Sequence, residues 1–251
     1  MAKVTVLCAL YKSGEYLESK LESIERLKRK EIAEFIFLNC GNHHDENKTI
    51  TEYAKDRNNV RLINFKDKTP LYETWNYGIR HTDSEYICNY NADDQWHPLY
   101  LNNMADHLDS NKEDMIVTSG VIMCGTPNQL YPKWHNIVGK LPSVPYPKTS
   151  AGPSPMWRRS VHDKCGLFGN YRVIGDARLW EAMQRHGMKF GLLAKDLVLY
   201  YINSNSLERR HCDDTGESLR EMDLAIPSAD SAKTVGKEES HPEHHAGACG
   251  Q

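Results

Sequence analysis

The chain has 251 residues, of which 39% are hydrophobic and 26% are charged, with a formal net charge of -3. This length suits one sizeable α/β domain, or one domain with a small appendage. The charge gives no global cationic field, so we expect no nucleic acid polymer as a partner. No apolar run is long enough for a transmembrane segment, and no signal peptide pattern is visible. Seven cysteines without a C-x-x-C pair are typical of reduced thiols, which predicts a soluble, cytoplasmic protein.

Short β-rich runs alternate with helical patterns through the first half of the chain, which predicts an α/β fold with a mainly parallel sheet. In chain order, we predict strands at 4–9, 34–38, 60–64, 86–90, 115–124, 190–193 and 197–202, and helices at 13–27, 47–57, 69–79, 97–108 and 176–187.

The second half of the chain is less regular. Seven of the eleven prolines fall between 127 and 155, which indicates a long loop that is either functional or an irregular surface excursion. We predict one domain over 1–207, an extension with a possible short helix over 208–226, and a disordered tail over 227–251. Zinc binding by the histidines of that tail is a weak alternative.

The most informative segment is Ile-Cys-Asn-Tyr-Asn-Ala-Asp-Asp-Gln-Trp-His-Pro, residues 87–98. A short apolar run stops on Asp93 and Asp94, and Pro98 follows the turn. Carboxylates clustered at the end of a buried strand suit a site for a hard divalent cation together with a diphosphate. Aspartates also favour turns and helix starts for local reasons, so this segment alone leaves both interpretations open.

Five motifs in order carry a resemblance to a known family. They are Ala9-Leu10-Tyr11-Lys12, Asn39-Cys40-Gly41-Asn42, Asn76-Tyr77-Gly78-Ile79, Asn91-Ala92-Asp93-Asp94 and Gly175-Asp176. Their order and spacing resemble the family 2 glycosyltransferases over roughly residues 3–207. The resemblance implies the GT-A fold, a single Rossmann-like, mainly parallel sheet flanked by helices, with a small antiparallel portion on the acceptor side.

The resemblance also implies an activity. Members of the family are inverting enzymes that transfer a sugar from a nucleotide-diphosphate donor, here most simply a UDP-sugar. The acceptor is a hydroxyl of a glycan, a lipid-linked molecule or a protein, and the cofactor is Mn²⁺ or Mg²⁺. The oligomeric state is left open.

Site residues follow from the same resemblance. Asp93 is the first choice for the metal ligand, and Asp94 is either its neighbour at the metal or the cap of the next helix. Asp176 is either the catalytic base or a simple helix cap. The residues that the resemblance places at the nucleotide sugar are Ala9, Leu10, Tyr11, Cys40, Asn76, Asn91, Ala92 and Asp93.

Trp157 and Arg158 are candidates for the acceptor side. Trp157 either stacks on an acceptor sugar or packs in the core, and Arg158 either pairs with a phosphate or is a solvated cation. Three positions depart from the family pattern, and one of them is Asn203, which stands where many relatives have a histidine. Asn91 stands where the first metal-site aspartate is usual, and Cys40 stands where a base-reading aspartate is usual.

Two other functions compete with glycosyl transfer. A sugar-phosphate nucleotidyltransferase would use a similar fold and a metal, but it needs a glycine-rich, basic first loop that residues 9–13 lack. A non-catalytic nucleotide-sugar-binding module of the same fold would explain Asn91 and Cys40. Intact Asp93 and Asp176 speak against that module.

Overall fold

The computed structural model describes residues 2–124, 137–141, 152 and 154–202. The chain divides into two units, Met1–Asp213 and Asp214–Gln251, and all described residues belong to the first. The predicted extension over 208–226 and the tail over 227–251 lie outside the described residues, as do Asn203 and most of the proline-rich segment.

The described elements are as follows. The strands are β1 (Val4–Leu10), β2 (Ala33–Cys40), β3 (Val60–Phe65), β4 (Tyr86–Asn89), β5 (Gln95–Trp96), β6 (Met115–Cys124), β7 (Ile137–Lys140), β8 (Met156–Arg158) and β9 (Phe190–Ile202). The helices are α1 (Gly14–Arg26), α2 (His44–Ala54), α3 (Leu71–Arg80), α4 (Tyr100–Ser110), α5 (Val161–Cys165) and α6 (Gly175–Arg185), with a 3₁₀ turn at Lys30–Ile32.

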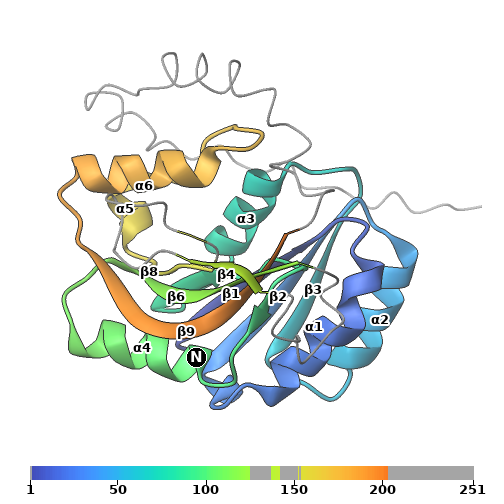
Figure 1. Ribbon diagram of the computed structural model, residues 1–251. Helices are drawn as coiled ribbons and strands as arrows, with labels where there is room; N and C mark the ends of the chain where they lie inside the picture. The colour runs from blue at the N-terminus through green and yellow to red at the C-terminus, as the bar shows by residue number, and fades with distance from the viewer. Residues whose placement is uncertain (1, 125–136, 142–151, 153, 203–251) are drawn as a thin grey trace, which may run out of the picture. The chain divides into compact units, whose positions relative to one another are not determined.

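The described strands form one sheet in the order β3-β2-β1-β4-β8-β6-β9-β5, with β7 paired to β6 (Figure 1). The first four strands pair in parallel, and β6 also pairs in parallel with β9. Strands β8, β7 and β5 make the antiparallel pairs. The chain order reverses at β1, which lies between β2 and β4, so the carboxyl ends of β1 and β4 flank the place where open α/β sheets bind ligands.

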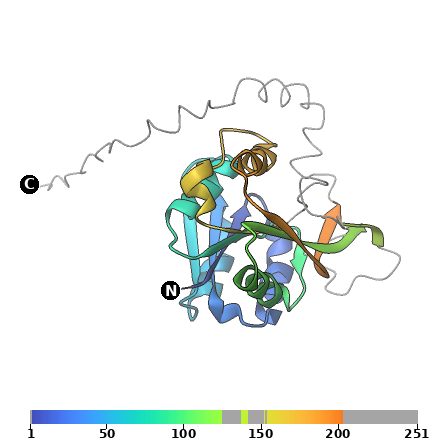
Figure 2. The same cartoon turned by 90° about the vertical axis from the view of Figure 1, so that its left-hand side faces the viewer.

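The sheet has an apolar core on each face because successive strand side chains point to opposite sides. In β1, Val4, Val6 and Cys8 pack with α1, α2 and α4, whereas Leu7 packs on the other face with α3, α5 and α6. Figures 1 and 2 show these two helical layers. The helices contribute stripes at helical spacing, such as Tyr72, Trp75 and Ile79 of α3.

The structure confirms the predicted elements of the first half of the chain, with α2 beginning three residues earlier than expected. It differs over 190–202, where β9 is one strand. The pairing of β6 with β9 shifts register between Thr118 and Gly120, and Thr118 Oγ1 donates to the carbonyl of Lys195 at 2.6 Å. This bulge accommodates the polar residues Lys195 and Asp196 without ending the strand.

The short elements were not expected from periodicity. They are β5, β7, α5 and the 3₁₀ turn. Each has five residues or fewer, which is too short for a hydrophobic period to be recognised. Among the helices of the described part, none has the length and apolar character needed to cross a membrane.

Candidate functional site

The acidic segment forms a tight turn just beyond the carboxyl end of β4. The backbone N–H of Asp94 donates to the carbonyl of Asn91 at 3.3 Å, and Asn91 Nδ2 donates to Asp94 Oδ2 at 3.0 Å. Asp94 is 1% exposed, whereas Asp93 is partly exposed. Asn91 therefore holds Asp94 inward, and Asp93 is the more accessible carboxylate of the pair.

A buried lysine supports this turn from below. Lys20 of α1 is 1% exposed, and its Nζ donates to the backbone carbonyls of Asn91, at 2.6 Å, and of Asp94. The same Nζ lies 3.1 Å from the ring centroid of Tyr90, a cation–π contact. Lys20 thus ties both ends of the turn to α1.

Burial dominates the electrostatics of this turn. It raises the pKa of the Asp94 carboxyl, and the charge of Asp93 raises it further, while Lys20 opposes both effects. Burial also lowers the pKa of Lys20. Asp94 Oδ1 is buried and has no hydrogen-bond partner among the described residues, although a backbone hydrogen bond from Tyr201 to this carboxyl helps to lower its pKa. Asp94 does not cap the next helix, because α4 begins at Tyr100 after Leu99 and has no side-chain cap.

Sequence reasoning missed Lys20. A lysine in a helix is usually solvated, and only its position indicates burial. Lys20 follows Leu17 by three residues and precedes Ile24 by four, so it shares the face of α1 that packs on the sheet.

The end of β1 supplies Tyr11, which is partly exposed. Its ring packs edge-on against His43 at 5.1 Å, and Lys68 Nζ lies 4.7 Å from its centroid. The loop after Tyr11 is held because the backbone N–H of Ser13 donates to Glu46 Oε1. Glu46, a second buried residue that the sequence analysis missed, is 2% exposed, and its burial raises the pKa of its carboxyl.

Of the other residues of β1 and β2 that were predicted to contact the nucleotide sugar, two have buried side chains. Ala9 is partly exposed, but Leu10 is fully buried in the core, so its side chain is not available to a ligand. Cys40 is 4% exposed, and its Sγ contacts Leu38 O at 3.4 Å and Thr74 Oγ1 at 3.3 Å. The side chains of Leu10 and Cys40 therefore lie in the core, and the prediction that these residues contact the nucleotide sugar is left to their backbone groups.

The side chain of Asn76, which was predicted to contact the nucleotide sugar, binds a neighbouring loop in the structure. Its Nδ2 donates to Phe168 O at 2.8 Å, and its Oδ1 accepts from the Phe168 N–H at 2.9 Å. Both ends of the amide are therefore engaged with the loop before α6. Gly78 of the same motif allows α3 to approach β1, because a Cβ there would lie 2.5 Å from Leu7 Cδ2.

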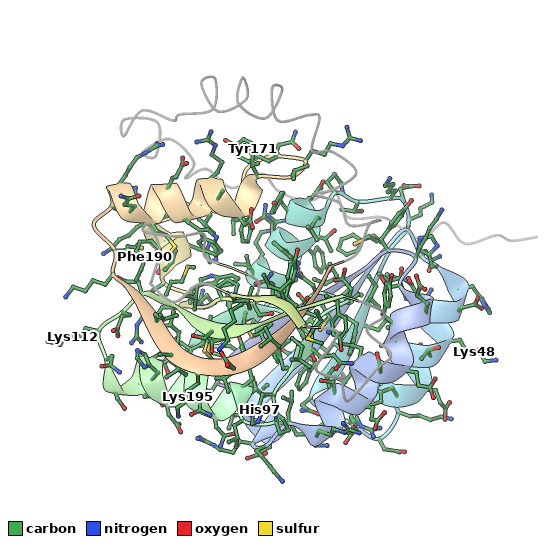
Figure 3. The ribbon with its side chains drawn as sticks, in the orientation of Figure 1. Lys48, His97, Lys112, Tyr171, Phe190 and Lys195 are labelled. Carbon is green, nitrogen blue, oxygen red and sulfur yellow. The ribbon has the colours of Figure 1, made fainter. Side chains whose placement is uncertain are left out.

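Asp176 lies in the first turn of α6, against the first turn of α3. Tyr72 Oη is 3.1 Å from Asp176 Oδ1 and also contacts the carbonyl of Val173. Asp176 Oδ1 accepts from the Ala177 N–H at 2.8 Å as well. Because α3 begins just after the carboxyl end of β3, Asp176 lies at the same edge of the sheet as the acidic turn. In Figure 3, Tyr171 marks the loop that leads into α6.

Of the two alternatives for Trp157, the structure favours packing in the core, and it places Arg158 away from the acidic turn. Trp157 is fully buried, and its Nε1 donates to His162 Nε2 at 2.9 Å. Arg158 pairs with Tyr86 at the amino end of β4, which is the edge opposite the acidic turn. Its guanidinium donates to the carbonyls of Leu108, in the last turn of α4, and of Asn111 and Glu113 beyond it.

The acidic turn fits a divalent cation in its donor chemistry. Carboxylate and amide oxygens are hard ligands, and Asp94 offers a buried oxygen, Oδ1, without a hydrogen-bond partner in the described part of the chain. The described residues contain no group of three or more histidine, cysteine or acidic side chains that could hold a metal ion. A cation here would therefore take one or two protein ligands and complete its shell with phosphate and water, as Mg²⁺ commonly does.

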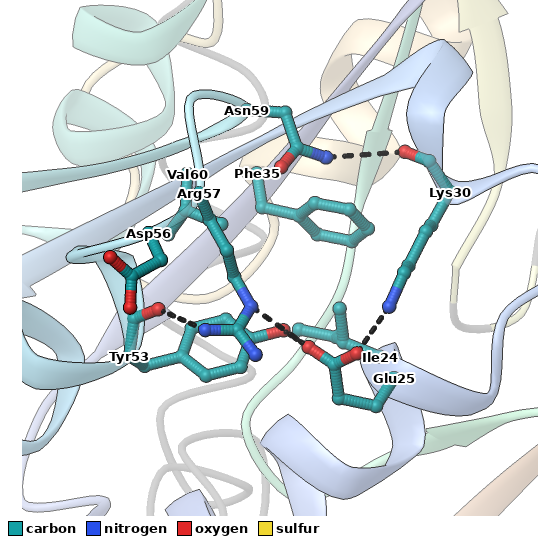
Figure 4. A pocket seen from close by; sticks show the side chains of 9 residues that line it. All are labelled: Ile24, Glu25, Lys30, Phe35, Tyr53, Asp56, Arg57, Asn59 and Val60. Carbon is teal, nitrogen blue, oxygen red and sulfur yellow. Dashed lines mark hydrogen bonds and ion pairs between the residues drawn. The ribbon is translucent and has the colours of Figure 1, made fainter.

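A pocket of another kind lies near the amino ends of β2 and β3, away from these residues (Figure 4). Glu25 accepts there from Tyr53 Oη at 2.7 Å, from Arg57 Nε at 2.9 Å and from Lys30 Nζ. Its burial alone would raise the pKa of Glu25, but the bonds from Lys30, Tyr53 and Arg57 outweigh burial and lower it to about 2. This cluster joins α1 to α2 and the 3₁₀ turn.

Comparisons with known proteins agree with this geometry. Residues 5–173 match the family described as "Glycosyl transferase family 2". That match includes the acidic turn and Tyr72, and it ends just before Asp176. No curated protein sequence matches the chain.

Several solved structures share the fold. S. aureus TarS 1–349 has a TM-score of 0.66 at 13% identity, over 92% of this chain and 68% of that chain. Its complex with UDP-GlcNAc has a TM-score of 0.61 at 12% identity, over 81% and 60%. The mannosyltransferase PcManGT from Pyrobaculum calidifontis, in complex with GDP-Man and Mn²⁺, has a TM-score of 0.65 at 13% identity, over 87% and 64%.

These structures confirm the predicted GT-A architecture, a mostly parallel sheet with a small antiparallel portion. The chain spans about two thirds of TarS 1–349 and 46% of the longer TarS chain. The family match covers more than half of the sequence, and the chain therefore belongs to glycosyl transferase family 2.

Proposed function

We propose that this chain transfers a sugar from a nucleotide-diphosphate donor, foremost a UDP-sugar, to an acceptor hydroxyl with inversion at the anomeric carbon. The acceptor is a glycan, a lipid-linked molecule or a protein. Nucleotide sugars are bound by structures of the same fold, UDP-GlcNAc by TarS and GDP-Man by PcManGT.

One observation carries the proposal. The turn with Asp93 and Asp94 follows β4 directly, beside β1 and at the point where the strand order reverses. A ligand at this switch point lies at the carboxyl ends of the strands, which brings its diphosphate to the turn. The partly exposed residues Ala9, Tyr11 and Ala92 remain the proposed contacts of the nucleotide sugar.

Asp93 is the proposed metal ligand, and Asn91 and Asp94 fix the turn that presents it. A divalent cation bound there supplies positive charge that stabilises the departing nucleoside diphosphate. Lys20 keeps the turn closed from the side of α1.

Asp176 is the proposed base. Inversion requires a group on the face opposite the leaving group to accept the proton of the acceptor hydroxyl as the new bond forms. A carboxylate at the same sheet edge as the acidic turn suits that task, and Asp176 is held there by Tyr72 and by its own helix.

Donor binding tests the proposal most directly. We would measure the melting temperature of the purified chain with UDP-GlcNAc, UDP-glucose and GDP-mannose, each with Mn²⁺ and with EDTA. A donor at roughly a hundred times its Kd adds about 2.7 kcal/mol of stability. We expect one donor to raise the melting temperature only with Mn²⁺, together with slow release of its free nucleotide.

Two results would contradict the proposal. Stabilisation by nucleoside triphosphates in place of nucleotide sugars would indicate nucleotidyl transfer. Stabilisation by a nucleotide sugar without nucleotide release, unchanged in Asp176→Asn, would indicate a binding module.

A further inference from the structure

Two side chains of α3 contact the loop and helix that carry Asp176. Asn76 binds both backbone groups of Phe168, at 2.8 and 2.9 Å. One turn earlier in α3, Tyr72 contacts the carbonyl of Val173 and Oδ1 of Asp176. The two side chains hold the segment at positions 168, 173 and 176, so α3 sets where the candidate base lies.

The contact between Tyr72 and Asp176 requires the glycine between Val173 and Asp176. A Cβ on Gly175 would lie 2.6 to 2.7 Å from three carbons of the Tyr72 ring. Only a residue without a side chain lets the ring approach this closely, and that approach brings the hydroxyl to Asp176. This explains why a glycine precedes the aspartate: without a side chain at position 175, the ring of Tyr72 can lie close enough to contact Asp176.

Tyr72 is a rigid partner. It is 3% exposed, its ring stacks on Phe168 at 5.5 Å, and it meets Trp75 edge-on at the same distance. Burial, followed by the negative charge of Asp176, raises the pKa of the phenol well above its usual range. The hydroxyl therefore stays protonated at physiological pH, and its single proton is shared between the carbonyl of Val173 at 2.5 Å and Oδ1 of Asp176 at 3.1 Å.

We propose that Tyr72 is a positioning residue for the catalytic carboxylate, orienting Asp176 through its hydroxyl toward the acceptor. This inference rests on the proposed function, in which Asp176 is the base. It assigns no contact between Tyr72 and the substrate. A hydrogen bond to a charged group contributes about 1.5 to 3 kcal/mol, so its loss corresponds to a rate decrease of roughly tenfold or more.

The test compares the wild-type chain with Tyr72→Phe, which removes the hydroxyl and keeps the ring on Gly175. UDP-GlcNAc, UDP-glucose and GDP-mannose with Mn²⁺ serve as probe donors, and free nucleotide is measured. We expect kcat to fall by roughly tenfold while the donor KM changes by less than about twofold. Tyr77→Phe is the matched control, because Tyr77 lies on the same helix and stacks on His81, and it should change neither constant.

A double-mutant cycle separates positioning from a general structural role. In the Asp176→Asn background, Tyr72→Phe should lower the rate by less than about twofold, because the carboxylate it orients is gone. An equal loss in both backgrounds, or a rise in donor KM that matches the loss in kcat, overturns the positioning role.

Failure of the inference and failure of the proposed function give different results. If Tyr72→Phe keeps the full rate while Asp176→Asn abolishes it, the positioning role is wrong and the base assignment stands. If Asp176→Asn keeps the full rate, or if the wild-type chain releases nucleotide from none of the three donors, the proposed function itself fails.

Discussion

The ammonium nitrogen of Lys20 lies 2.6 Å from the backbone carbonyl oxygen of Asn91, although the two residues are 71 positions apart. The contact places a positive charge beneath the turn that carries Asp93 and Asp94. Because Lys20 and Asp94 are both 1% exposed, each depends on the other for its charged form. Removing the lysine would leave the buried Asp94 carboxyl without the positive charge that lowers its pKa, and two backbone carbonyls without their donor.

Lys20→Met should therefore destabilise the fold most strongly above pH 7, because Asp94, whose pKa is about 7 in the wild-type chain, is left buried without a nearby cation. The pKa of Asp94 is already raised by burial, and without Lys20 it rises further. Its neutral form contributes stability at low pH, and this contribution is lost as the pH rises toward the folded-state pKa. Without Lys20 the loss continues to a higher pH, so chemical denaturation should show a difference between Lys20→Met and the wild-type chain that is larger at pH 9 than at pH 7.

The Lys20 prediction has an internal control. Asp94→Asn in the Lys20→Met background removes the uncompensated carboxylate and should recover most of the lost stability. Lys28→Met, at an exposed position beyond α1, should change little. A pH-independent loss in Lys20→Met would contradict the coupling with Asp94.

Asp93→Asn tests the metal ligand. It removes the accessible charge of the turn and leaves the bond between Asn91 and Asp94 in place. We expect donor-induced stabilisation in Mn²⁺ to fall to the level seen with EDTA, with an unchanged melting temperature of the free protein. The matched control is Asp83→Asn, an exposed aspartate before β4 at the amino edge of the sheet. Equal Mn²⁺-dependent shifts in Asp93→Asn and the wild-type chain would exclude Asp93 as a ligand.

Asn76→Ala distinguishes a structural from a donor-binding role. The substitution leaves the buried N–H and carbonyl of Phe168 without partners, which costs about 1 to 3 kcal/mol per group left unpaired. The melting temperature and kcat should both fall, because the loop that leads to Asp176 is released. Binding of UDP with Mn²⁺, measured by calorimetry, should be unchanged at a temperature where the variant is folded. Loss of UDP binding without loss of stability would instead indicate that Asn76 contacts the nucleotide sugar.

Sequence patterns predicted the strands that surround the candidate site. Strands such as β1 and β4 are apolar runs bounded by turn residues, and their carboxyl ends must meet in a parallel sheet. The position of Asp93 at that edge follows from the topology, whereas Asp176 lies there because α6 contacts Tyr72 of α3. Motif resemblance added the order of the segments, which local physics alone does not supply.

The direction of each side chain was harder to predict. Cys40 and Asn76 belong to motifs, yet both point into the protein and bond to Thr74 and Phe168. The sequence left two alternatives for Arg158, and the antiparallel direction of β8, set by long-range pairing with β4, carries it away from the acidic turn. Lys20 and Tyr72 were missed because their partners are 71 and 104 positions away.

Gly78→Ala tests the approach of α3 to the sheet. The new Cβ would lie 2.5 Å from Leu7 Cδ2, and Leu7 is fully buried, so the helix or the leucine must move. Overpacking of this kind costs about 1 to 3 kcal/mol. Gly14→Ala is the matched control, because a Cβ there meets nothing within 4 Å and alanine favours the start of α1. Urea denaturation should show a loss only for Gly78→Ala, and equal midpoints would contradict the packing role.

Glu25 gives a pH prediction that is independent of the proposed site. Its carboxylate holds Lys30, Tyr53 and Arg57 together, and its pKa is lowered to about 2 (Figure 4). A lowered carboxyl pKa contributes stability above the unfolded value of 4.5, and this contribution is lost as the pH falls toward 2. Because the side chain is 36% exposed, solvent screening limits the contribution to about 1 kcal/mol.

Glu25→Gln should therefore lower the melting temperature by about 2 to 4 °C at pH 7, and its difference from the wild-type chain should shrink between pH 4.5 and pH 2. Glu18→Gln, at an exposed position on α1, should match the wild-type chain throughout, and a Glu25→Gln difference that is constant with pH would show that the cluster is not held by the charge.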